Sequence, residues 1–216
     1  GIYHVYNRGV EKRTIFQDKQ DYRVFLHYLK RYLSEPNQSE SNNEVGPHMA
    51  QWNQNIYKEI SLFAYCLMPN HFHFLVKQIT NYGLTKLMRA LSNAYIRYFN
   101  EKYERVGPLF QGKFKAALAD TEPYVLHLSR YIHLNPLVHE SPSRSDLVKL
   151  IDYPYSSYSD YLGNRKTKWL YPEDILYYFK TSEMHHTKDI LSYQSFVEDY
   201  AVAPEEILGD LVIDSE

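Results

Sequence analysis

Residues 60–77 read ISLFAYCLMPNHFHFLVK and carry the strongest local fold signal in the chain. Two runs of β-branched, aromatic and aliphatic residues, 60–67 and 71–77, flank the short break at residues 68–70. Apolar runs bounded by turn residues are typical of β-strands, and a connection this short makes the two strands antiparallel neighbours. We therefore predict a β-hairpin here.

The segments outside the hairpin alternate between strand and helix patterns. Asp18 is a suitable helix N-cap, Asp120 or Thr121 caps a later helix, and Pro136 is expected to end that helix. In chain order we expect a strand at 2–8, a helix at 18–33, the hairpin, a helix at 85–103, a strand at 114–118 and a helix from 121 to about 134.

This order, β-α-β-β-α-β followed by a helix, is that of the ferredoxin-like, split βαβ arrangement. We therefore predict an α+β fold with one antiparallel sheet. Residues 1–136 are interpreted as the core, and the polar stretch 34–55 as a loop-like insertion. Residues 137–216 are interpreted as an appended segment of loops and short helices, near 173–180 and 192–200, that packs on the core or contacts a partner.

Composition fits a protein of the cytoplasm. The 216 residues are 44% hydrophobic and include one cysteine, which excludes an internal disulfide framework. No stretch resembles a signal peptide or approaches the ~20 apolar residues of a membrane helix. The net charge of −2 is divided unevenly: residues 1–135 hold 17 Lys and Arg against 11 Asp and Glu, whereas residues 136–216 hold 7 against 15. A basic first part beside an acidic tail is compatible with a nucleic-acid partner.

Two histidines in the third expected strand form a candidate metal pair. His71 and His73 are two residues apart, so both project from the same face of a strand, and Phe72 and Phe74 project from the other. Two imidazoles on one face can bind a divalent cation, but a third ligand must come from elsewhere in the fold. The pattern is weak alone, because His-x-His also occurs by chance on half-exposed strands.

The last core helix ends with the second candidate motif, residues 127–136 (HLSRYIHLNP). Tyr131 and Asn135 are four residues apart, and His127 lies one turn before Tyr131, so all three share a face. A tyrosine hydroxyl can be a covalent nucleophile if a metal or base assists it, and the asparagine carbonyl can supply an oxygen ligand. Most of the 22 tyrosines are expected to be packing residues, so only the combination with the histidines is informative.

These motifs resemble the single-tyrosine HUH transposases, particularly the REP-associated tyrosine transposase-like branch. The matching stretches are YHVYNRG at 3–9, CLMPNHFHFLV at 66–76, GPLFQGKFKA at 107–116, YIHLNP at 131–136 and YPYSSYSDY at 153–161. The resemblance covers residues 2–163, and the pairing of the second and fourth stretches is its most specific part. The acidic tail and the insertion at 34–55 depart from it without touching the matched motifs.

The resemblance implies a role for each motif. His71 and His73 match the HUH metal pair, Tyr131 matches the nucleophile, and Asn135 matches the polar residue that completes the metal site. Proteins of this type cleave single-stranded DNA, often beside a hairpin, form a 5′-phosphotyrosine link and leave a 3′-hydroxyl that can rejoin the DNA. The expected cofactor is Mg²⁺ or Mn²⁺.

Several basic residues are candidate contacts for DNA phosphates. Our candidates are Arg8, Arg13, Arg89, Arg97, Lys113 and Lys115. Ordinary solvated charge explains such residues equally well. The active species is either a monomer or a homodimer.

Three other functions compete with a transposase. A catalytically silent or host-domesticated hairpin-binding protein would not need the combined residues His71, His73, Tyr131 and Asn135. A replication-initiator or relaxase-like nickase would share the metal pair and the tyrosine, but here the metal strand precedes the tyrosine helix by about 60 residues, as the transposase resemblance implies. A structural protein with chance motifs is the remaining alternative.

Overall fold

The computed structural model describes residues 1–36, 56–137, 150–180 and 193–199. Most of the expected insertion at 34–55 and part of the expected C-terminal segment lie outside these ranges. Within them, no helix is both long enough and apolar enough to cross a membrane.

Four strands form one antiparallel sheet. They are β1 (Ile2–Arg8), β2 (Ile60–Met68), β3 (His71–Gln78) and β4 (Lys115–Ala119), and the spatial order is β2-β3-β1-β4. Each neighbouring pair is antiparallel. Together with α1 (Lys19–Leu33) and α2 (Gly83–Lys102), this order confirms the predicted α+β, ferredoxin-like fold.

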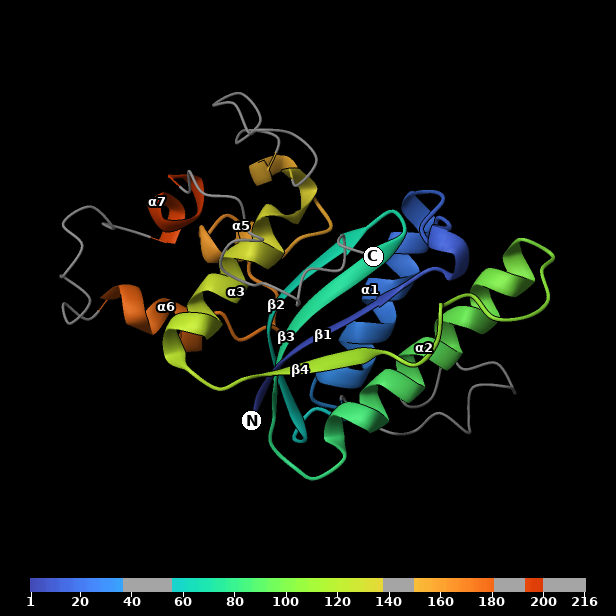
Figure 1. The fold of residues 1–216 in the computed structure, drawn as a ribbon, viewed down its shortest axis with the longest axis horizontal. Coiled ribbons are helices and arrows are strands. Elements are labelled where there is room, and N and C mark those ends of the chain that lie inside the picture. Colours follow the sequence, from blue (N-terminus) through green and yellow to red (C-terminus); the bar gives the residue numbers. More distant parts are fainter. Residues whose placement is uncertain (37–55, 138–149, 181–192, 200–216) are drawn as a thin grey trace.

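The sheet separates two apolar cores, with helices on both of its sides (Figure 1). Strands β1, β2 and β3 are mostly buried, whereas β4 is mostly exposed. Helices α1 and α2 cover one face, which carries Val5, Phe72 and Phe74. Helix α3 (Glu122–Leu134) crosses the other face and packs with the described C-terminal helices. The alternation of residues along a strand therefore decides which side chains face α3.

The first helix begins where the sequence predicts. The Asp18 carboxylate accepts hydrogen bonds from the backbone N–H groups of Gln20 (2.8 Å) and Asp21 (3.1 Å), and Asp21 completes a capping box. Asp21 is buried and receives hydrogen bonds from Tyr98, Lys102 and Tyr103, which join α1 to α2. This cap and network fix α1 and α2 on the same face of the sheet.

The end of α3 differs from the expectation in one respect. The α-helix stops at Leu134, but Asn135 keeps a helical conformation (φ −50°, ψ −37°) and the chain continues as the 3-10 turn η3 (Asn135–Leu137) through Pro136. Proline restricts the preceding residue and lacks an N–H donor, yet a single 3-10 turn tolerates it here. As a result Asn135 remains aligned with the last turn of α3.

The described C-terminal residues pack on the outer side of α3. They include α5 (Tyr158–Tyr161), α6 (Glu173–Lys180) and α7 (Tyr193–Glu198). The last two agree with the helices expected near 173–180 and 192–200, whereas α5 falls in a stretch expected to be a loop. Aromatic residues of α5 and α7, among them Tyr158, Tyr161 and Phe196, complete the second core.

A buried polar network joins these C-terminal helices to the core. The ring of His133, from α3, lies between the hydroxyls of Ser157 and Tyr193, each at 2.7 Å. The Ser157 hydroxyl also accepts a hydrogen bond from the backbone N–H of Tyr65 (2.9 Å) and donates to its carbonyl (3.2 Å) in β2. One hydroxyl therefore connects the sheet, α3 and the C-terminal segment.

We predict that Ser157→Ala lowers the free energy of unfolding by about 1–3 kcal/mol, because it leaves a buried N–H of Tyr65 and a ring nitrogen of His133 without their partner. Urea unfolding followed by circular dichroism measures this. Ser159→Ala is the matched control, since that half-buried hydroxyl makes one hydrogen bond, to the Ile151 carbonyl (3.1 Å). Equal losses in the two variants would contradict a central role for Ser157.

Candidate active site

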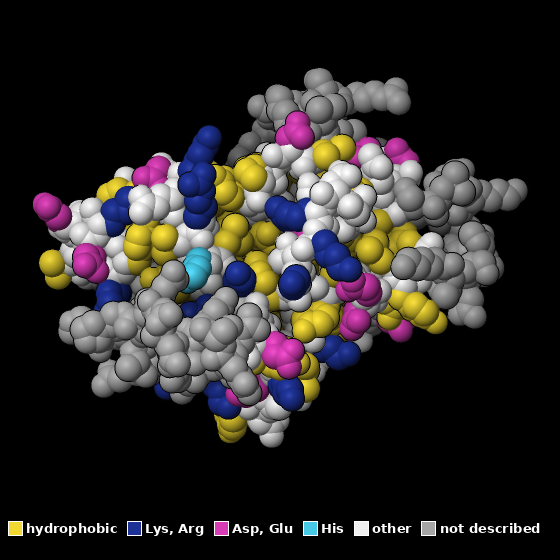
Figure 2. Space-filling model, turned by 180° about the vertical axis from the view of Figure 1, so that it is seen from behind, with side chains coloured by type: hydrophobic (Ala, Val, Ile, Leu, Met, Phe, Trp, Pro, Cys, Tyr) yellow, Lys and Arg dark blue, Asp and Glu magenta, His cyan; other side chains and the backbone are white. Residues whose placement is uncertain are grey.

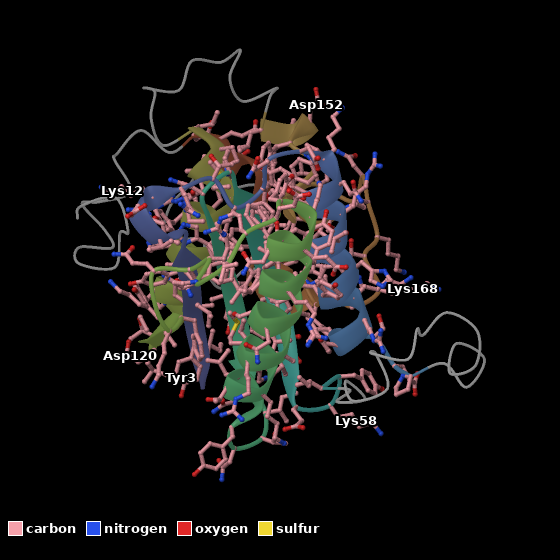
Figure 3. All side chains as sticks on the ribbon, turned by 90° about the vertical axis from the view of Figure 1, so that its right-hand side faces the viewer. Tyr3, Lys12, Lys58, Asp120, Asp152 and Lys168 are labelled. Carbon is pink, nitrogen blue, oxygen red and sulfur yellow. The ribbon has the colours of Figure 1, made fainter. Side chains whose placement is uncertain are left out.

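The paired histidines lie at the start of β3 and face α3. His71 and His73 are 4% and 0% exposed, so the alternative of two surface histidines on a half-exposed strand is wrong. Phe72 and Phe74 project into the opposite core, as the alternation predicts. Asn70, next to His71 in the chain, donates a hydrogen bond to the Lys12 carbonyl. Lys12 lies near one end of the sheet, and Tyr3 and Asp120 lie near the other (Figure 3).

Helix α3 brings its two predicted residues onto this pair. The ring of Tyr131 meets the ring of His73 edge to face, with centroids 5.4 Å apart and planes at 88°. One turn later, Asn135 Oδ1 lies 3.0 Å from His71 Nε2. The structure thus places Tyr131, Asn135 and both histidines in one buried cluster, although β3 and α3 are far apart in the sequence.

The hydrogen bond from His71 to Asn70 favours one tautomer of the His71 ring. In that tautomer the nitrogen that faces Asn135 carries a lone pair. The Asn70 amide Nδ2 donates to the Lys12 carbonyl (3.3 Å), so its Oδ1 is the atom that accepts from His71 Nδ1 at 2.6 Å. A neutral His71 with its proton on Nδ1 has only a lone pair on Nε2. The lone pairs of His71 Nε2 and Asn135 Oδ1 then point at the same place.

Two lone pairs 3.0 Å apart are matched either by a proton on the ring nitrogen or by a cation that both atoms contact. Asn135 Nδ2, which could have donated to the ring, is instead buried with no hydrogen-bond partner among the described residues. Ligand atoms about 2.1 Å from a divalent ion and at right angles to one another lie about 3.0 Å apart. The donors at this position therefore fit a cation.

His73 supplies the second nitrogen of the pair. Its Nε2 atom is buried and has no hydrogen-bond partner among the described residues, whereas Nδ1 is hydrogen-bonded to another histidine. A buried ring nitrogen without a partner is uncommon and fits a ligand position. The described residues contain no cluster of three or more His, Cys, Asp or Glu that could hold a metal, so the third protein ligand here would be the Asn135 amide oxygen.

Sequence reasoning missed His4, which lies in β1 directly beside His73. Its Nε2 is 2.8 Å from His73 Nδ1, and both residues are 0% exposed. Burial lowers the pKa of His4 to about 3 and lowers that of His73 well below its ordinary value, with the neighbouring His71 and His4 as further causes. The alternation of residues 2–8 could have indicated His4, because His4, Tyr6 and Arg8 share one face of that strand.

Two predicted DNA contacts lie on the same face of the sheet as the histidines. Arg8 pairs with His71 across β1 and β3, and Lys115 pairs with Tyr6 across β4 and β1. Arg8 is 8% exposed, whereas Lys115 is exposed and its Nζ lies 5.9 Å from the centre of the Tyr6 ring. These two cations lie in the sheet that holds the candidate metal pair.

The other four predicted contacts lie outside the four strands of the sheet. Arg89 and Arg97 are exposed on α2, which covers the opposite face of the sheet, and Lys113 is exposed before β4. Arg13 lies 3.8 Å from Glu11 in an ion pair. Figure 2 shows basic, acidic and apolar side chains intermixed on the face it presents, so the described residues there do not form one continuous basic surface. DNA contact by all six residues stays a prediction.

One comparison with known protein families matches the part of the chain that holds both motifs. The protein thus combines a ferredoxin-like sheet, a strand with a His-x-His motif, and a helix whose Tyr131 contacts that motif. Residues 33–135 match the sequence profile of the family described as Transposase IS200 like, and this match confirms the resemblance to transposases that the motifs indicated. No curated protein matches the chain.

A solved structure described as "Structure of the REP associates tyrosine transposase bound to a REP hairpin" is also similar to this chain. The two share 15% sequence identity with a TM-score of 0.45, over 81% of this chain and 84% of that one.

The buried histidines predict a pH-dependent stability in the cation-free protein. Burial lowers the pKa of His133 to about 3, as it does for His4, and both are near 6.5 when unfolded. Because the folded pKa is depressed, the stabilisation is complete above pH 6.5 and is lost as the pH falls toward the folded value. Each such histidine removes up to about 1.4 kcal/mol per pH unit in that range.

Urea unfolding in EDTA at pH 7.5, 6.0, 5.0 and 4.5 tests this dependence. Most carboxylates titrate below about pH 5, so the interval from pH 7.5 to 5.0 reports mainly on histidines. Constant stability from pH 7.5 to 4.5 would show that the buried histidines are not held neutral in solution.

Proposed function

We propose that this transposase-family protein cleaves and rejoins single-stranded DNA beside a hairpin, through a 5′-phosphotyrosine intermediate on Tyr131 and with a divalent cation. One observation carries the proposal: Tyr131 and Asn135, from one face of α3, meet His71 and His73, from one face of β3, in a single cluster. A nucleophile, two nitrogen donors and an oxygen donor in contact are the groups that this chemistry requires.

The chain's own residues have distinct tasks in the reaction. The Tyr131 hydroxyl oxygen attacks the phosphorus in line and loses its proton, the bond from phosphorus to the 3′ oxygen breaks, and that oxygen leaves as a hydroxyl after gaining a proton. His71, His73 and Asn135 would hold the cation, which when bound polarises the phosphate and offsets its developing charge. Arg8, beside His71, would help to bind the phosphate.

Rejoining follows from the same groups. The phosphotyrosine bond keeps the energy of the cleaved phosphodiester, so a 3′-hydroxyl can attack it, release Tyr131 and reseal a strand without an external energy source. Tyr131 is 2% exposed in this structure, so the reaction requires that DNA gain access to it.

The central prediction concerns the hydroxyl of Tyr131. Tyr131→Phe removes only that oxygen, so we expect it to abolish the covalent protein–DNA product while hairpin binding stays within about threefold of the parent protein. The assay is a denaturing gel with 5′- and 3′-labelled single-stranded hairpin DNA and Mn²⁺, beside a native gel for binding.

Tyr124→Phe is the matched control, because Tyr124 is a half-buried residue on the same helix and its buried hydroxyl has no hydrogen-bond partner among the described residues. Undiminished nicking by Tyr131→Phe would remove Tyr131 as the nucleophile. Hairpin binding by the parent protein without any covalent product, over a panel of genomic hairpins, would favour a catalytically silent DNA-binding protein.

A second prediction concerns the cation. We expect His71→Ala to weaken Mn²⁺ binding by at least about tenfold and to reduce cleavage in parallel, because it removes one of two nitrogen ligands. Asn135→Leu is expected to weaken binding as well, since it removes the oxygen ligand and keeps similar volume. Electron paramagnetic resonance of free Mn²⁺ during titration measures both affinities.

His27→Ala is the control for this titration, because His27 is exposed on α1, which covers the opposite face of the sheet. Identical titrations for the parent protein, His71→Ala and Asn135→Leu would show that the proposed ligand set is wrong.

A further inference from the structure

We propose that His4 is a positioning residue that fixes His73 in the orientation and tautomer needed to bind the cation. This inference rests on the proposed function, because it assigns a role to His4 toward the same metal site. The sequence motifs assigned no role to His4. Because His4 is far from His71 and Asn135 along the chain, the sequence alone did not indicate that it lies in the same cluster.

The contact between the two rings is direct and fully buried. His4 Nε2 and His73 Nδ1 are 2.8 Å apart, and the rings lie nearly parallel, with centroids 5.1 Å apart and planes at 12°. In the β1–β3 register His73 is opposite Tyr6, so His4 is its diagonal neighbour on the same face. Since both residues are 0% exposed, water does not compete for this hydrogen bond.

Two tautomeric arrangements of this pair are available to neutral rings. In the first, His4 donates from Nε2, and the proton of His73 then occupies its own Nε2, which blocks that atom as a ligand. In the second, His73 donates from Nδ1 to His4 Nε2, and His73 Nε2 presents a lone pair. Only the second arrangement can bind a cation, so cation binding selects His4 as the hydrogen-bond acceptor.

The remaining nitrogens of the pair support this selection. His73 Nε2 and His4 Nδ1 are both buried without a hydrogen-bond partner among the described residues. Either tautomer leaves one buried lone pair and one buried N–H unmatched, so the pair by itself has no strong preference. A cation on His73 Nε2 uses the lone pair of the second arrangement and removes that ambiguity. Metal-bound histidines commonly donate their other N–H to a fixed acceptor, which tunes and orients the ligand.

The surroundings of His4 hold it in place. Its ring contacts Tyr6, with centroids 4.8 Å apart, and meets Tyr131 edge to face at 6.0 Å. His4 therefore touches both the proposed ligand His73 and the proposed nucleophile Tyr131. A change at His4 is expected to act on cation affinity through His73, without removing any ligand atom.

Two substitutions separate the hydrogen bond from packing. His4→Phe keeps a flat ring between Tyr6 and Tyr131 but removes the acceptor, whereas His4→Gln retains an amide oxygen near the position of Nε2. We expect His4→Phe to weaken Mn²⁺ binding by about 10- to 100-fold, the range found for loss of outer-shell partners of metal ligands, and His4→Gln to recover a substantial part of that loss. Mn²⁺ titration followed by electron paramagnetic resonance gives both values for the full chain, with urea unfolding as the check on folding.

A spectroscopic readout tests the tautomer itself. In ¹⁵N-histidine-labelled protein, His73 is expected to carry its proton on Nδ1 when Mg²⁺ is bound, as shown by the ¹⁵N shifts of its two ring nitrogens and assigned with His73→Gln. Protonation on Nε2 in the presence of saturating Mg²⁺ would overturn the inference.

The outcomes also distinguish this inference from the proposed function. If His71→Ala weakens Mn²⁺ binding and His4→Phe does not, the metal site stands and the role of His4 is wrong. If neither His71→Ala nor His4→Phe changes Mn²⁺ binding, the metal site of the proposed function fails and the inference fails with it. Equal losses in folded His4→Phe and His4→Gln would show that an amide oxygen does not replace the ring nitrogen and would contradict the acceptor role. A loss in His4→Gln alone would assign the effect to ring packing.

Discussion

The packing of α3 across one face of the sheet is the constraint on which the rest of the site depends. A strand places every second side chain on that face, and a helix places every fourth side chain near the same line. His71 and His73 in β3 therefore meet Asn135 and Tyr131 in α3 only if the two elements keep this alignment. The His71–Asn135 contact of 3.0 Å shows that the two elements are aligned in this way.

The alignment is maintained from the far side of α3. The His133 ring faces away from the candidate site and lies between Ser157 and Tyr193, and Ser157 also bonds the backbone of β2 at Tyr65. A buried polar network of this kind specifies one arrangement, because any shift of α3 would leave several buried donors without partners. The described C-terminal residues thus support the site although none of the proposed ligands comes from them.

Local sequence patterns predicted much of this architecture, because each pattern reports a short-range rule. The hairpin at residues 60–77 follows from apolar runs around a turn, and Asp18 begins α1 because its carboxylate caps free N–H groups. The placement of His71 and His73 on one face follows from the alternation of a strand. The contact of Tyr131 with His73 required the motif pairing of a known family in addition, since neither motif specifies its partner.

The features that sequence reasoning missed depend on contacts between distant segments. His4 lies beside His73 because β1 lies between β3 and β4 and pairs with β3 in a particular register. The predicted ferredoxin-like order implies that these strands are neighbours, but no local pattern encodes the register. Likewise, α2 carries Arg89 and Arg97 on the opposite layer of the sheet, which helical spacing alone does not reveal. Burial is similarly invisible locally, and it decides that the His4–His73 pair is neutral.

That neutrality connects the stability of the fold to its proposed chemistry. Burial makes a proton on His4 or His73 unfavourable, so the site resists filling its nitrogen lone pairs with protons near neutral pH. Asn135 adds an oxygen whose lone pairs face His71 Nε2. A neutral His71 that donates its Nδ1 proton to Asn70 in a hydrogen bond has no second proton to donate to this oxygen. A divalent cation brings its own charge and can satisfy several lone pairs at once. The same burial that disfavours protons therefore leaves nitrogen and oxygen donors that the proposed divalent cation would use.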